Sequence, residues 1–186
     1  GEYKAKEHLQ AHAALIDEFE STGAMQRSLE FLPSVEEIDL RRRAGQGLTR
    51  PELGVLSSYA KIAFTQKLLE SDFLDAPELA YWVIDYFPKP IQKGYKEEIL
   101  HHRLRREIIA TRIANSVINR MGPDFVRSRV IKTGMPPAEV AKAYLIVREA
   151  FGLQDLWQRI EGLDNTVPAH TQIKAMDIVV QRFFFF

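Results

Sequence analysis

Two histidines, His8 and His12, stand four positions apart, a spacing that can hold a metal ion on one face of a helix. A zinc site of this kind also needs a glutamate or a third ligand beside the pair, as in the H-E-x-x-H motif, and none follows here. His101 and His102 are adjacent, so they point to different faces of a helix and cannot chelate together. We therefore predict no metal site and interpret His8 and His12 as surface or partly buried side chains.

The only hint of a nucleotide-binding motif is Gly45-Gln46-Gly47. In the fingerprint G-x-G-x-x-G the third glycine lets the helix pack closely on a strand, but Arg50 stands at that position here. No strand is predicted before Gly45, so we expect no cofactor in this chain and interpret Thr49 as the cap of a helix after a bend. The sequence contains no nucleophile elbow, phosphate loop or zinc motif, and we name no catalytic residue.

The strongest local charge asymmetry lies between residues 101 and 132, which contain eight lysines and arginines but only two acids. Residues 41–43 add three more arginines. One interpretation is a nucleic-acid surface, which needs side chains free to meet phosphates. The stretch lacks the interleaved aromatic residues that bind single strands, so we favour a domain interface or intramolecular ion pairs. The candidate interface or ion-pair residues are Arg103, Arg105, Arg106, Glu107 and Arg112.

The composition indicates a folded chain without a charge bias. The 186 residues are 46% hydrophobic, which suffices for a core, and 25 basic residues balance 25 acidic ones. The absence of cysteine excludes disulfides and thiolate chemistry and suits a reducing compartment, so we expect a cytoplasmic protein. We find no export signal and no apolar segment long enough to cross a membrane. Four phenylalanines at residues 183–186 favour a segment cut from a longer chain.

The positions of caps and glycines predict helices throughout the chain. Ser34 with Glu37 and Thr49 with Glu52 form capping boxes, and five glycines follow segments with helical periodicity. Sustained two-residue alternation and hairpin turns are missing. We therefore predict an all-α fold of about eight or nine helices, orthogonal or bundle-like and without a sheet. The predicted helices span residues 4–21, 35–44, 50–70, 76–87, 95–121, 123–133, 137–151, 153–163 and 167–183.

The longest predicted helix, residues 95–121, has an apolar arc covering more than half its circumference. Arg103 and Glu107, four positions apart, fall inside this arc and would need each other or another partner. The sharpest break before this helix is Phe87-Pro88-Lys89-Pro90, because proline disfavours helix at the residue before it. We predict a single helical domain, residues 1–186, with a subdomain joint near residues 88–90.

Four phrases of this sequence resemble one protein family. They are residues 29–34 (LEFLPS), 45–53 (GQGLTRPEL), 104–112 (LRREIIATR) and the stretch 151–165, which opens with FGL and closes with LDN. In this order they are similar to the C-terminal helical region of the large bacterial NAD-specific glutamate dehydrogenases. The resemblance runs from about residue 29 to about residue 168, and it implies that the chain is a fragment of a larger multidomain protein.

The resemblance implies what the parent protein does. In that family the parent enzyme oxidatively deaminates L-glutamate to 2-oxoglutarate and ammonium, with NAD as the hydride acceptor. The family's catalytic lysines and nucleotide-binding domain lie upstream of the phrases quoted, so no catalytic residue is carried over to this chain. NAD would be the cofactor of the parent and not of this segment.

The role implied for this segment is non-catalytic and serves assembly, interdomain packing or regulation. Its implied partners are the upstream catalytic domain of the same chain and further copies in a homo-oligomer. The alternative from the residues alone is a free-standing helical adaptor or nucleic-acid-binding module that uses the basic stretch 101–132. We expect no membrane partner, and we rank nucleic-acid binding well below the interface.

Overall fold

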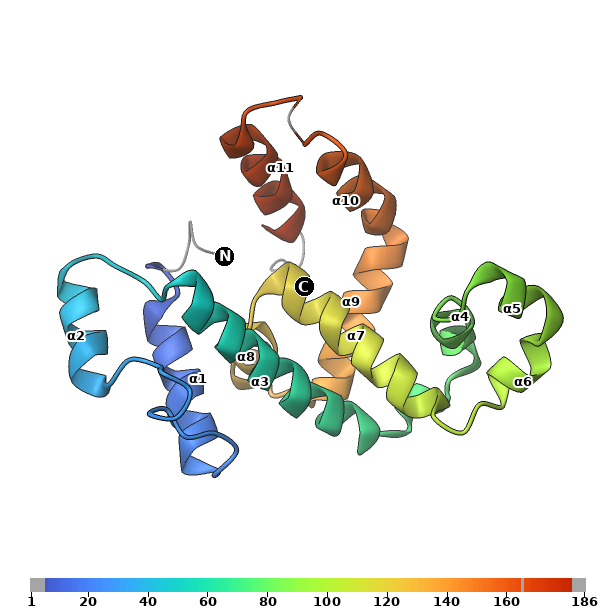
Figure 1. Ribbon diagram of the computed structural model, residues 1–186, viewed down its shortest axis with the longest axis horizontal. Coiled ribbons are helices and arrows are strands. Elements are labelled where there is room, and N and C mark those ends of the chain that lie inside the picture. Colours follow the sequence, from blue (N-terminus) through green and yellow to red (C-terminus); the bar gives the residue numbers. More distant parts are fainter. Residues whose placement is uncertain (1–5, 165, 182–186) are drawn as a thin grey trace. The chain divides into compact units, whose positions relative to one another are not determined.

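The computed structural model describes residues 6–164 and 166–181, and every regular element in these ranges is helical (Figure 1). They contain eleven α-helices and two short 3-10 helices, and no strand, which confirms the predicted all-α class. The chain divides into two compact units, Gly1–Ala138 and Glu139–Phe186. No helix in the described ranges has the length and apolarity that a membrane crossing requires.

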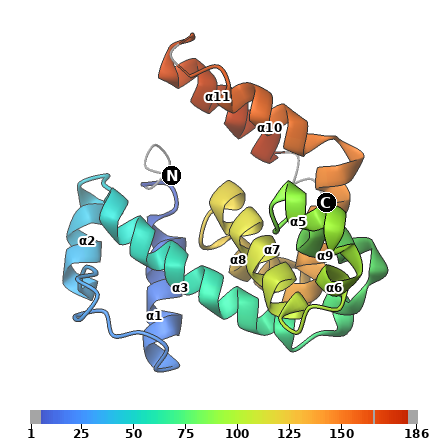
Figure 2. The same ribbon diagram turned by 45° about the vertical axis from the view of Figure 1, so that its right-hand side comes forward.

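The first unit is built around two helices, α3 and α7, which make the most extensive contact between elements (Figure 2). Ile109, Ile113 and Val117 on α7 are completely buried, and Leu56 and Phe64 on α3 are buried as well. Truncating one such side chain to alanine costs about 2 to 5 kcal/mol, because it leaves a cavity. The elements of this unit are α1 (Leu9–Ser21), α2 (Val35–Arg43), α3 (Arg50–Leu69), η2 (Asp72–Asp75), η3 (Pro77–Leu79), α4 (Ala80–Ile84), α5 (Lys89–Gly94), α6 (Lys96–Leu100), α7 (Arg105–Met121) and α8 (Phe125–Thr133).

The starts of α2 and α3 are set by the two predicted capping boxes, and both are confirmed. The hydroxyl of Ser34 accepts from the amide of Glu37 at 3.2 Å, and the Glu37 carboxylate accepts from the Ser34 amide at 2.7 Å. At α3 the Glu52 carboxylate accepts from the Thr49 amide, also at 2.7 Å. These bonds satisfy amides that the first helical turn leaves without a partner.

The predicted glycine stops are also confirmed. At the end of α8, Gly134 adopts the left-handed conformation with φ of 72°, and its amide donates to the carbonyl of Val130 at 2.9 Å. A residue with a Cβ atom is strained in this conformation, which is why glycine ends the helix at little cost. The glycines with positive φ are Gly23, Gly45, Gly122, Gly134 and Gly152.

The prediction of one continuous helix over residues 95–121 is wrong. The chain forms α6, then an irregular segment from His101 to Leu104, and then α7. At this break the imidazole Nδ1 of His102 accepts from the amide of Leu104 at 3.2 Å, so a side chain competes with the helical backbone. The apolar periodicity continues through the break, which is why the sequence pattern hid it.

The segment around the two prolines contains a helix that was not predicted. α4 ends at Ile84, and Pro88 stands immediately before the short helix α5, with Pro90 in its first turn. Proline is tolerated there because the first turn does not use its missing amide. With the split of residues 95–121, this raises the number of described α-helices from the predicted nine to eleven. The single domain with a subdomain joint near residues 88–90, which lie inside the first unit, stays a prediction.

The second unit contains α10 (Leu153–Glu161), α11 (Ala169–Gln181) and all but the first two residues of α9 (Pro137–Ala150). The rings of Tyr144 and Trp157 stack with their centroids 6.4 Å apart, which joins α9 to α10. The side-chain amide of Gln172 donates to the carbonyl of Ile160 at 2.8 Å and thereby joins α11 to α10. Three predictions concern residues outside those described: helix at residues 4–5, helix at residues 182 and 183, and the interpretation of the phenylalanines at 183–186.

Candidate interface and ion-pair site

Arg106, in the first turn of α7, closes the C-terminal end of α3. Its Nη2 donates to the carbonyls of Leu69 and Ser71, both at 2.9 Å, and its Nη1 pairs with the carboxylate of Asp75. Leu69 is the last residue of α3, so its carbonyl has no partner within the helix. A charged donor on such a carbonyl is also favoured by the partial negative charge at the C-terminus of the helix.

Arg112, two turns further along α7, binds α4 in three ways. Its Nη1 donates to the carbonyl of Trp82 at 2.9 Å, and its Nη2 pairs with Oδ2 of Asp85 at 3.0 Å. Its guanidinium carbon lies 5.5 Å from the centroid of the Trp82 ring, a cation-π distance. Arg105 donates to the carbonyl of Leu74 at 3.3 Å. We call Arg105, Arg106 and Arg112 the arginine row, and it ties α7 to residues 69–85.

The two other candidate residues, Arg103 and Glu107, are exposed and lie outside the arginine row. Their predicted place inside the apolar arc is wrong. Arg103 lies in the break before α7, which begins at Arg105, and Glu107 lies on the exposed side of α7. The sequence analysis missed Asp75 and Asp85, which precede their arginine partners by 31 and 27 residues. Only the folded chain brings such distant groups together, and no local spacing signals the pairing.

Two further basic residues of the stretch 101–132, Arg127 and Arg129, also make contacts inside the first unit. Nε of Arg127 on α8 donates to Oε2 of Glu18 on α1 at 2.6 Å. The guanidinium of Arg129 lies 5.9 Å from the ring of Phe125. Four of the eight cations between residues 101 and 132 therefore have carboxylate or carbonyl partners within the unit, and these contacts favour intramolecular ion pairs over a nucleic-acid surface.

Within the second basic cluster, Arg41 joins the end of α2 to the start of α3. Arg41 forms a two-pronged pair with Glu52, at 2.6 and 2.8 Å, and Arg42 pairs with Asp39 one turn earlier at 2.9 Å. Burial alone would raise the pKa of Glu52, but the hydrogen bonds from Arg41 and Thr49 and the charge of Arg41 outweigh it. The pKa of Glu52 is therefore lowered, and the carboxylate stays charged at neutral pH.

The two histidines meet a carboxylate that the sequence analysis did not assign to them. Nδ1 of His8 and Nε2 of His12 each lie 3.5 Å from an oxygen of Asp124, in the turn between α7 and α8. Burial would raise the pKa of Asp124, but the hydrogen bond and charge of His12 and the charge of His8 lower it. His12 is buried rather than at the surface, and Asp124 gives it a polar partner. Among the described residues no group of three or more potential ligands is arranged to hold a metal ion.

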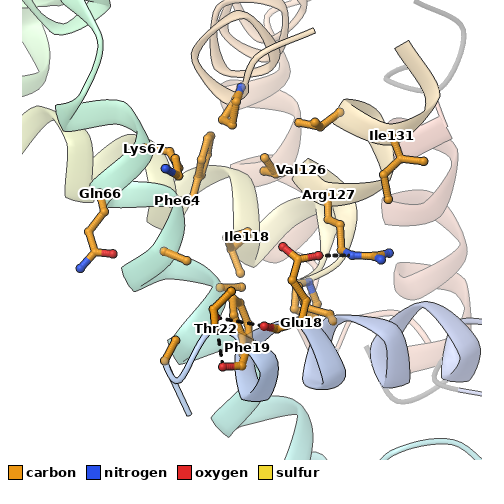
Figure 3. Close-up of a pocket in the computed structure, with 17 residues that line it drawn as sticks. Glu18, Phe19, Thr22, Phe64, Gln66, Lys67, Ile118, Val126, Arg127 and Ile131 are labelled. Carbon is orange, nitrogen blue, oxygen red and sulfur yellow. Dashed lines mark hydrogen bonds and ion pairs between the residues drawn. The ribbon is translucent and has the colours of Figure 1, made fainter. Parts of the chain in front are cut away.

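A pocket of about 520 Å³ opens between α1, α3, α7 and α8 (Figure 3). Its walls are mainly apolar, and in the close-up two of the lining side chains, Glu18 and Arg127, point toward one another and pair. Two further polar residues of the lining make contacts within the unit: the Thr22 hydroxyl donates to the Glu18 carbonyl at 3.0 Å, and Lys67 pairs with Glu70 at 2.9 Å. Such a lining can hold an apolar group by contact, and its described residues include no pair of groups placed for acid-base chemistry. The apolar lining includes Leu15, Phe19, Phe64, Ile118, Val126 and Ile131.

The glycine motif of residues 45–47 joins two helices, α2 and α3, in place of the strand and helix that a dinucleotide fingerprint connects. Helices, caps and internal ion pairs together define an all-helical protein domain.

Residues 45–183 match the family model described as glutamate dehydrogenase, C-terminal. This match confirms the resemblance seen in the four sequence phrases.

Individual relatives agree with the family model. The chain is 42% identical over 175 residues to the NAD-specific glutamate dehydrogenase of Halomonas elongata, and 43% identical over 174 residues to that of Pseudomonas aeruginosa. The corresponding protein of Mycobacterium tuberculosis is 32% identical over 154 residues. Each of the first two alignments covers 94% of this chain but only 11% of the relative. The chain therefore belongs to the glutamate dehydrogenase C-terminal family.

Proposed function

We propose that the chain is the non-catalytic C-terminal helical domain of a large NAD-dependent glutamate dehydrogenase. The parent would oxidatively deaminate L-glutamate to 2-oxoglutarate and ammonium, with hydride transfer to NAD on the upstream part of the polypeptide. The domain itself would serve assembly, interdomain packing or regulation. The observation that carries this proposal is the coverage: 94% of this chain aligns with only 11% of relatives that bear the name NAD-specific glutamate dehydrogenase.

The contacts inside the first unit support a packing role. The arginine row uses its guanidinium groups on carbonyls and carboxylates of residues 69–85, and the Arg41–Glu52 pair joins α2 to α3. Charge-assisted hydrogen bonds of this kind fix the relative positions of helices. A unit held in one shape can present a constant surface to the rest of a large polypeptide. This is the physical task that the geometry fits best.

The first experiment separates the catalytic part from the helical part. Full-length protein and the 186-residue chain are purified separately and incubated with L-glutamate and NAD, and NADH formation is followed by absorbance. We expect turnover by the full-length protein only, and no tight NAD binding by the chain in a calorimetric titration. Turnover or tight NAD binding by the chain alone would overturn its non-catalytic role, and an inactive full-length protein would overturn the proposed parent.

The second experiment addresses assembly. The partners we propose are the upstream catalytic domain of the same polypeptide and further copies in a homo-oligomer, in the cytoplasm. Full-length protein and a version that lacks residues 1–186 are compared by sedimentation velocity and by turnover. We expect the truncated version to lose oligomers, activity or both. If it keeps the oligomeric state and the turnover of the full-length protein, the domain contributes neither to assembly nor to catalysis.

A further inference from the structure

The loop between α1 and α2 contains an aromatic residue in an unfavourable backbone conformation. Phe31 has φ of 53° and is the one residue other than glycine with a positive φ in the described part of the chain. For a bulky side chain this left-handed region is disfavoured, because Cβ comes too close to the backbone. Such a conformation persists only where the surrounding structure imposes it, and such residues cluster at functional positions.

Arg27 imposes much of this loop conformation. Its Nε pairs with Glu20 at 3.0 Å and its Nη2 with Asp17 at 2.5 Å, so two acids of α1 hold it. Its Nη1 donates to the carbonyl of Pro33 at 3.3 Å, and its own carbonyl accepts from the amide of Leu32 at 3.0 Å. Arg27 therefore links α1 to Leu32 and Pro33, the two residues that follow Phe31.

Two further contacts fix the loop to the body of the first unit. The hydroxyl of Tyr59 on α3 donates to Oε1 of Glu30 at 2.6 Å. Met25 and Leu32 are buried in the same apolar core as the inner faces of α1, α2 and α3. The residues on both sides of Phe31 are thus anchored inward, and the loop is held by the fold on both sides of Phe31.

The side chains that this rigid loop turns outward are apolar. Phe31 is 89% exposed, more than any other large hydrophobic residue among those described, and Leu29 is 68% exposed. On the adjacent helix α2, Val35 and Leu40 are 58% and 63% exposed. A rigid exposed aromatic beside aliphatic neighbours is the type of residue that dominates protein-protein contacts when it enters a partner's pocket. It also loses little conformational entropy on binding.

We propose that Phe31, with Leu29 beside it, is an anchor that inserts into an apolar pocket on the upstream part of the same polypeptide. The anchor deepens the proposed function and rests on the part of it that makes this chain one domain of a longer polypeptide. The choice of partner follows from the length of the relatives, which are about nine times longer than this chain, and from the matched family, which is a C-terminal one. The loop precedes residue 45, where the family match begins, so along the chain it lies on the side of the upstream polypeptide.

The charges of the loop indicate how the anchor recognises its partner. Arg27 is neutralised by Asp17 and Glu20, and Glu30 accepts from Tyr59, so the charged groups of the loop are already engaged within the unit. Recognition then rests on burial of apolar surface, which added salt does not screen. A partner in the same polypeptide is also present at a high effective concentration, which favours it over a second copy.

The test uses the full-length protein with a photoreactive phenylalanine at position 31. Ile62 on α3, 56% exposed in an ordinary helical backbone, is the matched control position. After illumination, denaturing gels separate links within one polypeptide from links between copies, and mass spectrometry identifies the linked residues. Turnover with glutamate and NAD is measured on the same preparations. We expect position 31 to link to upstream residues of the same polypeptide, in several-fold higher yield than position 62, at low and high salt alike.

Three results would overturn the anchor: links from position 31 to a second copy, no link at all, or equal yields at the two positions. The turnover measurement keeps the two proposals apart. Links to the upstream polypeptide in a protein without turnover would leave the anchor standing and refute the proposed enzyme. Full turnover without such links would refute the anchor alone.

Discussion

The arginine row on α7 and the loop between α1 and α2 differ in which side chains make internal contacts and which are exposed. The arginines have the chemistry of a binding surface, yet their hydrogen bonds go to residues 69–85 of their own unit. The charged side chains of the loop, Arg27 and Glu30, bond to groups of the same unit, and the loop exposes Phe31 and Leu29. The comparison shows that in this domain charge holds helices together, whereas the surface best suited to a partner is apolar.

The largest effect in this comparison is expected when Arg106 is removed. Arg106→Ala leaves the carbonyls of Leu69 and Ser71 and the carboxylate of Asp75 without this donor, so we expect the unfolding free energy to fall by about 3 kcal/mol. Chemical denaturation of the 186-residue chain measures this change in unfolding free energy. The exposed Arg103→Ala is the control, with an expected change within about 0.5 kcal/mol. Equal losses in both variants would show that the row does not hold the unit together.

The Arg41–Glu52 pair extends the comparison to pH. Glu52→Gln removes a carboxylate whose side chain is only 12% exposed, and we expect a loss of about 2 kcal/mol at neutral pH. Because the pKa of Glu52 is lowered in the folded chain from its ordinary 4.5, its contribution is present above that value and is lost as the pH falls through the folded pKa. The difference between wild type and variant should therefore shrink below pH 4.5 in denaturation series. A difference that stays constant through this range would contradict the account.

A smaller effect is expected for Arg112→Lys, which keeps the charge. An ammonium group cannot reproduce the planar fork that reaches Trp82 and Asp85 together, so we expect a loss of about 1 kcal/mol. Thermal denaturation monitored by circular dichroism measures it, with the exposed Arg103→Lys as the matched control. If Arg112→Lys is neutral, the geometry of the guanidinium does not matter and only its charge does.

The smallest effect has the opposite sign and tests the loop. Phe31→Asn places a residue that tolerates positive φ where phenylalanine is strained, so the unfolding free energy of the 186-residue chain should rise by about 0.5 to 1 kcal/mol. In the full-length protein the same substitution should lower the thermal midpoint, because it removes the anchor. The same sign in both proteins would mean that Phe31 is strained without a binding role.

Local chemistry made part of the fold predictable. The starts of α2 and α3 follow from the capping boxes of Ser34 with Glu37 and of Thr49 with Glu52. The helix ends at glycines follow from the ability of glycine to adopt a positive φ. The break at residues 101–104 was hidden because the apolar periodicity passes through it, and that periodicity does not show that the Leu104 amide donates to the His102 imidazole there. Helix positions were thus predictable to the extent that neighbouring residues determine them.

The candidate site was predictable only in its composition. The arginines stood out by charge, but their partners Asp75 and Asp85, like Asp124 beside His12, lie far away in sequence and meet them through tertiary packing. Phe31 gave no signal at all, because nothing in its type predicts a left-handed conformation. Hydrogen bonds around Arg27 enforce it, and these exist only once α1 and the loop are folded.

Hydrogen-deuterium exchange, compared between the full-length protein and the 186-residue chain, tests the central claim most directly. The account predicts that peptides covering residues 28–34 exchange more slowly in the full-length protein, because the upstream polypeptide covers the loop. Peptides covering residues 105–112 should exchange alike in both proteins, because the arginine row makes its contacts within the unit. Protection of residues 105–112 with none at residues 28–34 would contradict the account.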